Sequence, residues 1–359
     1  MNADFITALN QIEKEKGISK DIIIEAVENA LVNAYKKNFG ATNNVRVIID
    51  RDKGDIRVYT SKHVVNKREI DLLDGEISLE GAQEIDMGYQ VGDVVEEEVT
   101  PKNFGRVAAQ TARQMVVQKI KEASRDIVYE EFSLIKSEIL NGEVVRRIGT
   151  SPRPNVLVSL SMRGAKGQLI ETEALLPAQE QMPTEDYPLN ARRTVYVSEV
   201  KTKNGVPEII VSRAHAGLVK RLFEREVPEI QEGLVQIKSV AREAGSRTKM
   251  SVLSVDEDID AIGACVGQKG QRVAAIVDEL KGEKIDIIEY SDDPVEYISS
   301  ALSPAKVVSV EVDEEEHSAL VIVPEYQLSL AIGKEGQNAR LAAKLTGWKI
   351  DIKSEQENI

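Results

Sequence analysis

The sequence predicts a multidomain α+β protein, and three regions of pattern support this prediction. Helical periodicity over residues 4–39 is followed by an alternating hairpin and by a long helix. Short strand-like runs separated by Pro and Gly then fill residues 141–213, and residues 213–359 contain two copies of one mixed helix and strand unit. A chain of 359 residues is long enough for two to four domains of ordinary size.

The net charge of −14 is distributed unevenly along the chain. Residues 1–125 carry 18 basic and 21 acidic side chains, and residues 126–212 carry 10 and 12. Residues 213–275 carry 10 and 9, whereas residues 276–359 carry 8 and 18, a net charge of −10. Phosphate binding depends on charges within about 10 Å at ordinary salt, so the acidic C-terminal segment does not exclude a nucleic-acid ligand.

Composition also limits the location of the protein and its chemistry. No apolar run reaches the length of a membrane span, and the first residues lack a basic region followed by an apolar stretch. The single cysteine, Cys265, fits a reducing compartment. With His63, His215 and His317 scattered along the chain, no metal-ligand cluster is visible. We therefore expect a cytoplasmic protein with no membrane partner, no metal and no cofactor.

The first 125 residues predict an N-terminal α/β domain with a helical arm. Asn43 to Val65 alternates as a hairpin around a turn at Asp52-Lys53-Gly54, and Phe104 to Leu140 has uninterrupted helical periodicity. The apolar positions of the two preceding helices define one face each: Phe5, Leu9 and Ile12 in the first, and Ile22, Ile23, Ala26, Ala30, Leu31 and Ala34 in the second. We place this domain at residues 1–125.

Residues 135–212 predict a small β-barrel of the OB type. The number of short strands and the Pro and Gly residues between them favour this architecture, with a generic β-domain of no particular ligand as the alternative. The predicted strands are Gly142–Ile148, Asn155–Leu160, Gln168–Thr172, Thr194–Val200 and Glu208–Ser212.

The C-terminal part contains an internal repeat. Residues 264–271 align with residues 330–337, and each segment leads into a helix, Arg272–Leu280 or Asn338–Leu345. Each copy then ends on a strand with an Ile-Asp-Ile core, and two strand-like runs precede each loop. The order helix, strand, strand, helix, Gly-x-x-Gly, helix, strand is that of a type II KH domain. We place the two domains at residues 213–290 and 291–359.

The two loops of the repeat point to single-stranded RNA. Glycine lets a nucleic-acid backbone come close, and the helix that follows offers free N–H groups and a positive dipole end to phosphate. A groove beside such a loop accepts unstacked bases. One Gly-x-x-Gly can be an ordinary helix connection, but two copies in the same context favour KH domains. The loop residues are Gly267, Gln268, Lys269 and Gly270, and Gly333, Lys334, Glu335 and Gly336.

Several stretches resemble the bacterial NusA family of transcription termination/antitermination factors, and the resemblance covers essentially the whole chain. The most specific stretches are Phe104–Ala112, Phe223–Ile230, Ala241–Lys249, Gly263–Gly267, Leu330–Gly333 and Gly336–Ala342. The resemblance implies that the two Gly-x-x-Gly loops contact RNA. It also implies that Arg242, Arg247 and Lys249 flank the first groove and pair with phosphates.

The resemblance implies partners and activity as well. The N-terminal domain of the family contacts core RNA polymerase near the RNA exit channel, and the barrel and KH domains bind nascent single-stranded RNA. Such a factor prolongs pauses, assists intrinsic termination and acts in antitermination complexes. NusG and the complex of NusB with a ribosomal protein are further expected partners, and we expect the chain to be a monomer.

Two other classes of protein combine KH and OB modules: RNA-processing enzymes and ribosome-associated RNA-binding proteins. Catalysis would need a carboxylate cluster for a metal, or a nucleophile with its base. The acidic runs Glu96–Glu98 and Glu314–Glu316 are better explained by a strand end and a charged hairpin tip. We therefore expect a transcription factor that is not an enzyme.

Overall fold

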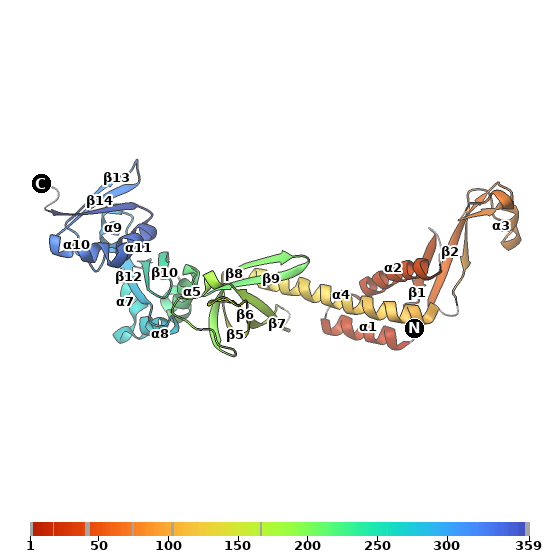
Figure 1. Ribbon diagram of the computed structural model, residues 1–359, viewed down its shortest axis with the longest axis horizontal. Helices are drawn as coiled ribbons and strands as arrows, with labels where there is room; N and C mark the ends of the chain where they lie inside the picture. Colours follow the sequence, from red (N-terminus) through yellow and green to blue (C-terminus); the bar gives the residue numbers. More distant parts are fainter. Residues whose placement is uncertain are drawn as a thin grey trace. The chain divides into compact units, whose positions relative to one another are not determined.

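The computed structural model describes residues 3–16, 18–39, 44–73, 75–101, 104–165, 167–256 and 258–355. Asn43, the first residue of the predicted hairpin, lies outside these residues. The chain divides into two compact units, residues 1–127 and residues 128–359. Helices and strands mix in both units, and the second contains a closed barrel and two similar mixed sheets, which confirms the predicted fold class (Figure 1).

The first unit contains a four-stranded sheet in which one long strand, β2, takes part in every pairing. Strand β2 pairs with β1 and β4 in antiparallel fashion and with β3 in parallel. In the turn of the predicted hairpin, Asp50 Oδ1 accepts the backbone N–H groups of Asp52 and Lys53 at 2.9 and 2.8 Å. The elements are α1 (Ala3–Lys16), α2 (Lys20–Phe39), β1 (Val45–Ile49), β2 (Ile56–Val65), η1 (Glu69–Asp71), β3 (Glu76–Ser78), α3 (Leu79–Ile85), β4 (Val94–Glu98) and α4 (Phe104–Leu134).

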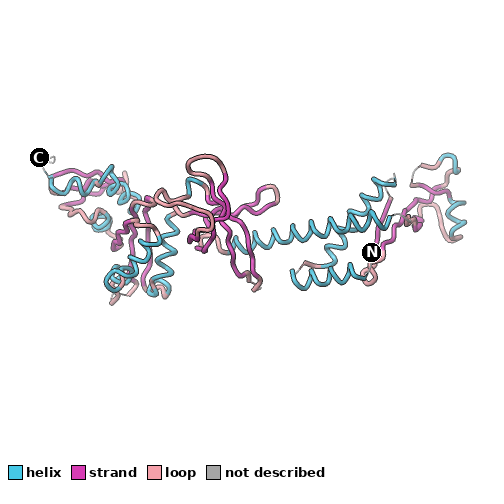
Figure 2. The backbone as a smooth tube through the Cα atoms, turned by 60° about the horizontal axis from the view of Figure 1, so that its bottom comes forward, coloured by secondary structure: helices cyan, strands magenta, loops and turns pink. Residues whose placement is uncertain are grey.

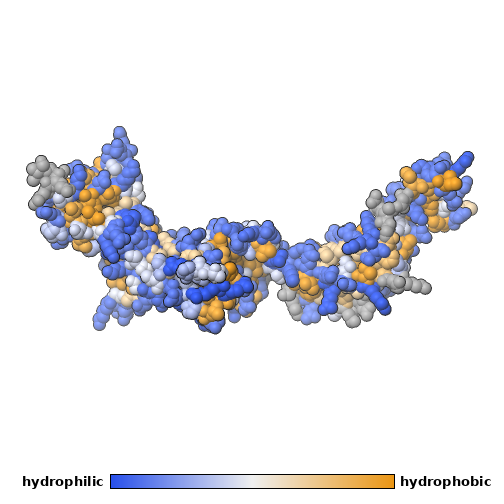
Figure 3. Space-filling view, viewed as in Figure 1, coloured by the Kyte–Doolittle hydropathy of each residue, from blue (hydrophilic) through white to orange (hydrophobic). Residues whose placement is uncertain are grey.

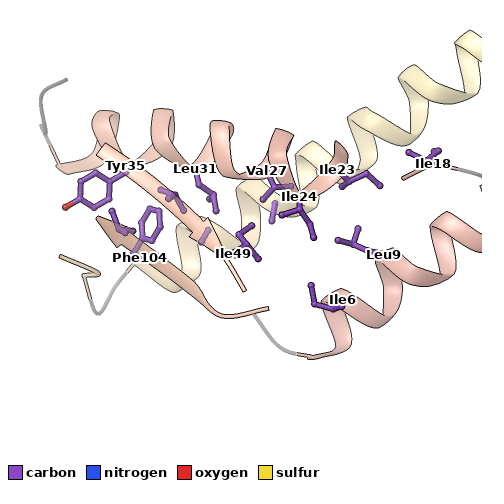
Figure 4. Close-up of a cluster of buried hydrophobic side chains, with 14 residues drawn as sticks. Ile6, Leu9, Ile18, Ile23, Ile24, Val27, Leu31, Tyr35, Ile49 and Phe104 are labelled. Atoms are coloured by element: carbon purple, nitrogen blue, oxygen red, sulfur yellow. The ribbon is translucent and has the colours of Figure 1, made fainter. Parts of the chain in front are cut away.

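The main core of this unit lies between α1, α2, the β1–β2 hairpin and the first turns of α4 (Figure 4). Helix α2 buries Ile23, Ile24, Val27, Leu31 and Tyr35, which recur every three or four residues. The predicted face of this helix was partly wrong, because Ile22 is 58% exposed. A run of three isoleucines fits more than one helical face, and the packing of α1 and α4 decided which face is buried.

Helix α4 is one continuous helix (Figure 2), shorter than predicted. We expected helix as far as Leu140, but α4 ends at Leu134 and strand β5 begins at Ile139. Between them, Ser137 has a φ of 71° and donates its backbone N–H to the Val197 carbonyl at 2.9 Å. The backbone N–H of Ser137 therefore bonds to the barrel instead of continuing the helix.

The barrel closes in the order β5-β6-β7-β9-β8, with β7 and β9 parallel and the other pairs antiparallel. This is the order of an OB-type barrel. All five predicted strands are found, and the third extends further than predicted, to Leu176. The elements are β5 (Ile139–Ile148), β6 (Asn155–Arg163), β7 (Leu169–Leu176), η2 (Ala178–Glu180), β8 (Arg192–Lys203) and β9 (Val206–Ser212).

The two KH domains have the same topology. In each, an antiparallel pair of strands is joined by a third strand parallel to the second, β10-β11-β12 and β13-β14-β15. The first contains α5 (Ala216–Glu226), α6 (Pro228–Gln231), β10 (Val235–Glu243), β11 (Arg247–Ser254), α7 (Ala261–Val266), η3 (Gln268–Gly270), α8 (Gln271–Glu279) and β12 (Lys284–Glu289). The second contains α9 (Pro294–Ala301), β13 (Ser309–Asp313), β14 (Ser318–Val323), α10 (Glu325–Ile332), η4 (Lys334–Gly336), α11 (Gln337–Thr346) and β15 (Lys349–Ser354).

Candidate nucleic-acid interface

The two Gly-x-x-Gly loops have the same backbone conformation. Gly267 has φ 73° and ψ 176°, and Gly333 has φ 76° and ψ 170°. The third residue of each loop is left-handed although it is not glycine, with φ 53° at Lys269 and 54° at Glu335. Such a conformation is uncommon for residues with a Cβ. Its recurrence shows that the repeat extends to the conformation of single loop residues.

Each loop leads directly into the N-terminus of a helix. Gly270 is the N-cap of α8 and Gly336 is the N-cap of α11. Because glycine has no side chain, neither N-cap residue offers an oxygen to the first N–H groups of its helix. The loop side chains of Gln268, Lys269, Lys334 and Glu335 are exposed. Both loops thus combine helix N–H groups, a positive dipole end and access from solvent.

The first glycine of each loop packs closely on the helix that follows. A Cβ at Gly267 would lie 2.7 Å from Arg272 Cγ, and a Cβ at Gly333 would lie 2.8 Å from the backbone nitrogen of Asn338. Beside the first loop is a hollow of about 450 Å³, whose lining includes Glu229, Gly267, Gln268, Gln271 and Arg272. This hollow adjoins the first loop, where the sequence predicts a groove for unstacked bases.

The three cations predicted to flank the first groove are all held by carboxylates. The Arg242 side chain is 1% exposed, and its Nε and Nη2 each donate to the Glu283 carboxylate at 2.9 Å. Lys249 is fully buried, and its Nζ donates to Asp286 at 3.2 Å and to the Ser303 carbonyl at 2.7 Å. Burial lowers the pKa of Lys249, and Asp286 opposes this effect.

Neither the Arg242 nor the Lys249 head group reaches solvent, so each would have to leave its carboxylate to pair with a phosphate. That these two residues bind phosphate stays a prediction. Arg247 is 24% exposed and donates to both Asp286 oxygens, at 2.6 and 2.9 Å. Arg247 is therefore a partly accessible cation in an ion pair with Asp286, and its contact with phosphate stays a prediction.

A buried ion-pair network joins the barrel to the first KH domain. Arg213, the residue directly after β9, pairs with Glu185, and neither side chain is exposed. Its Nη1 also donates to the Thr194 carbonyl in β8 and to Glu279 Oε1 in α8, both at 2.8 Å. Burial raises the pKa of the neighbouring Tyr187, whose hydroxyl donates to Glu185. The network fixes the position of α8, and hence of the first loop, against the barrel.

The second loop lies against the first KH domain. Gln337, directly after the loop, donates from Nε2 to Glu243 Oε2 at 2.8 Å and to Ser246 Oγ at 2.7 Å. Arg340 Nε donates to Glu243 Oε1 at 2.7 Å. Glu243 is the last residue of β10, and Ser246 lies in the turn that leads to β11. The turn of one KH domain therefore borders the loop of the other.

Two arginines lie beside the loops although the sequence analysis did not include them among the site residues. Arg272 and Arg340 both lie near the start of the helix that follows a loop. The available signal was an arginine within seven residues of the first loop glycine, which can also be an ordinary solvated side chain.

Among the described residues, no group of three or more His, Cys, Asp or Glu side chains is placed to bind a metal ion. Within the same residues, no helix combines the length and apolar character of a membrane crossing.

An OB-type barrel followed by two KH domains with solvent-facing loops defines a protein of the multidomain KH class, whose modules bind single-stranded RNA. Family models match the chain as the NusA N-terminal domain over residues 4–126, the NusA-like first KH domain over 213–290 and the NusA-like second KH domain over 294–358.

Curated relatives agree with these matches over the full length. The chain is 56% identical over 357 residues to the transcription termination/antitermination protein NusA of Bacillus subtilis, covering 99% of this chain and 92% of the relative. It is 42% identical over 360 residues to NusA of Thermus thermophilus, covering 98% and 89%. The chain belongs to the NusA family of transcription termination/antitermination proteins, which confirms the resemblance seen in the sequence.

Proposed function

We propose that this chain is a transcription elongation factor that binds nascent single-stranded RNA through its two KH loops and core RNA polymerase through its N-terminal unit. Through these contacts it modulates pausing, intrinsic termination and antitermination. One observation carries the RNA-binding half of the proposal. Two Gly-x-x-Gly loops with the same backbone conformation, in a member of the NusA family, each present an exposed turn at a helix N-terminus.

The loops are tested by giving each of them a negative charge. Replacement of Gln268-Lys269 and of Lys334-Glu335 by Asp pairs places negative charge where phosphates would approach. We expect the affinity for single-stranded RNA to fall at least tenfold while the circular dichroism spectrum is unchanged. A matched control, Lys36-Lys37 to Asp-Asp at the end of α2, makes a similar charge change in the other unit. A folded loop variant that binds RNA as tightly as the parent would refute the assignment.

The polymerase surface that we propose is an exposed apolar patch in the segment between β2 and β4. Ile70 is 92% exposed and Met87 is 90% exposed. Leu73, Ile85 and Val91 of the same segment, and Val94 at the start of β4, are also exposed. Orange surface covers part of this segment in Figure 3. Exposed apolar residues grouped in this way mark protein-binding surfaces.

Retention of core polymerase tests this surface. We expect a fragment of residues 1–127, which has its own core, to retain core polymerase in a pull-down. We expect Ile70→Asp with Met87→Asp to abolish retention, since both side chains are exposed and their replacement leaves the core intact. Full retention by the double variant would remove the patch from the proposal.

The alternative functions are a ribosome-associated protein and an RNA-processing enzyme. Co-purification with ribosomal subunits rather than polymerase would favour the first, and degradation of labelled RNA in magnesium would favour the second. The names of the relatives describe transcription factors and favour neither. NusG, the NusB complex, the monomeric state and the cytoplasmic location stay predictions.

A further inference from the structure

We propose that an arginine beside each KH loop binds phosphate, and that in the free protein this arginine is paired with a carboxylate from outside the loop. RNA binding then exchanges this carboxylate for a phosphate. The pairs are Arg272 with Glu229 and Arg340 with Glu243. The inference rests on the proposed RNA-binding function and adds the residues that regulate its strength.

In the second KH domain the arginine lies directly beside the loop. Arg340 Nη1 donates to the Glu335 carbonyl at 3.0 Å, and the same atom would lie 3.8 Å from a Cβ at Gly336. Arg340 Nε donates to Glu243 Oε1 at 2.7 Å. The arginine side chain is 47% exposed and the carboxylate 24% exposed, so a phosphate can reach the guanidinium.

In the first KH domain the arginine lies over the first loop glycine. Arg272 Nη1 donates to Glu229 Oε2 at 2.9 Å and to the Ala264 carbonyl at 2.6 Å. The Arg272 and Glu229 side chains are 30% and 29% exposed. Both line the hollow beside the loop, next to Gln268. A phosphate at this loop would meet the cation and its counter-ion together.

The two pairs do not correspond within the repeat. The position of Arg272 is taken in the second copy by Asn338, which is buried and donates to the carbonyls of Leu302 and Ala331 at 3.0 and 3.1 Å. Glu229 lies in α6, whereas Glu243 lies at the end of β10. Each KH loop therefore has a carboxylate-bound arginine that does not derive from the shared fold. This recurrence at different positions indicates a role at the loops themselves.

Charge and hydrogen-bond geometry decide how a carboxylate and a phosphate compete for each arginine. The hydrogen bond from Arg340 lowers the pKa of Glu243, and the backbone N–H of Glu229 followed by Arg272 lowers the pKa of Glu229. Both carboxylates are therefore charged at neutral pH and repel an approaching phosphate. Partly exposed ion pairs are weak, whereas guanidinium binds phosphate through two parallel hydrogen bonds. Phosphate can thus replace the carboxylate, and the carboxylate reduces the net affinity.

The experiment removes the carboxylate charges while keeping their shape in the full-length chain. Glu243→Gln and Glu229→Gln should each tighten binding of a single-stranded RNA roughly three- to fivefold at low salt, the size of a unit-charge interaction a few Å apart in water. Arg340→Gln and Arg272→Gln should weaken binding and flatten the log–log salt dependence by about 0.7 per lost contact. The matched control is Glu315→Gln in the turn between β13 and β14, which makes the same charge change and should leave affinity within twofold.

A double variant separates exchange from a general charge effect. If Glu243 acts through Arg340, the gain from Glu243→Gln should fall by at least half in an Arg340→Gln background. If the parent chain binds RNA but Glu243→Gln and Glu229→Gln bind it no more tightly than Glu315→Gln, the inference is wrong and the proposed function stands. The same holds if the gain in affinity persists in the Arg340→Gln background. A parent chain that does not bind single-stranded RNA overturns the proposed function as well.

Discussion

The ion-pair network between the barrel and the first KH domain gives a sharp stability prediction for Arg213→Met. Arg213 donates to Glu185, to Thr194 and to both the side chain and the carbonyl of Glu279. The substitution keeps an unbranched apolar stem but leaves the Glu185 carboxylate buried. Within the part of the chain that the structure describes, the Tyr187 hydroxyl is then its remaining side-chain donor. Removing one partner of a buried pair costs about 3–5 kcal/mol.

The magnitude translates into a measurable shift. For a unit of this size, 1 kcal/mol lowers Tm by about 2–4 °C, so Arg213→Met should lower it by roughly 6–20 °C. Calorimetry of the full-length chain should show this shift in the transition of residues 128–359 and leave that of residues 1–127 unchanged. The single tryptophan, Trp348, packs in the second KH domain and reports the same transition by fluorescence.

Two further variants make the test specific. Arg225→Met breaks a pair with Glu226 at 3.4 Å in which the side chains are 46% and 37% exposed, so we expect a loss below about 1 kcal/mol. Adding Glu185→Gln to Arg213→Met removes the orphaned charge and should recover part of the loss. If Arg213→Met shifted Tm no more than Arg225→Met, the account of a stabilising buried network would be wrong.

Three other predictions concern the KH domains. Gly333→Ala would bring a Cβ within 2.8 Å of the Asn338 backbone nitrogen and should lower both Tm and RNA affinity. The control is Gly282→Ala, which has φ 87° and nothing within 4 Å of the added Cβ; it should cost only about 1–3 kcal/mol of strain and leave RNA affinity within twofold. Burial raises the pKa of Cys265 to about 12, so iodoacetamide at pH 8 should modify this thiol in urea and not in the native chain; rapid native labelling would contradict the buried position. Because burial lowers the pKa of Lys249, the unfolded chain binds the Lys249 proton more tightly than the folded chain does. The Tm of the parent minus that of Lys249→Met should therefore rise with pH up to about 10.4, and a fall in this Tm difference would contradict the assigned cause.

Much of the fold was readable from local pattern. The alternation of the N-terminal hairpin, the Pro and Gly residues between the barrel strands and the repeated order of helices and strands are all features of short segments. The two loops were found for the same reason, since the glycines and the helix that follows are neighbours in the chain. Helix α2 shows the limit of this approach. Helical structure was predicted over residues 4–39, but the buried face predicted for this helix was partly wrong because Ile22, Ile23 and Ile24 are equally apolar.

The sequence by itself determined the family, the order of domains and the position of the two loops, because each depends on residues close together in the chain. Only the tertiary structure decided which cations are available to RNA. Arg242 is paired with a carboxylate 41 residues away, and Arg340 with one 97 residues away. Lys249 and Lys269 have the same side chain, yet one is buried and the other exposed. Coulomb attraction and desolvation depend on distances and burial in the folded chain, and the identity of a residue specifies neither.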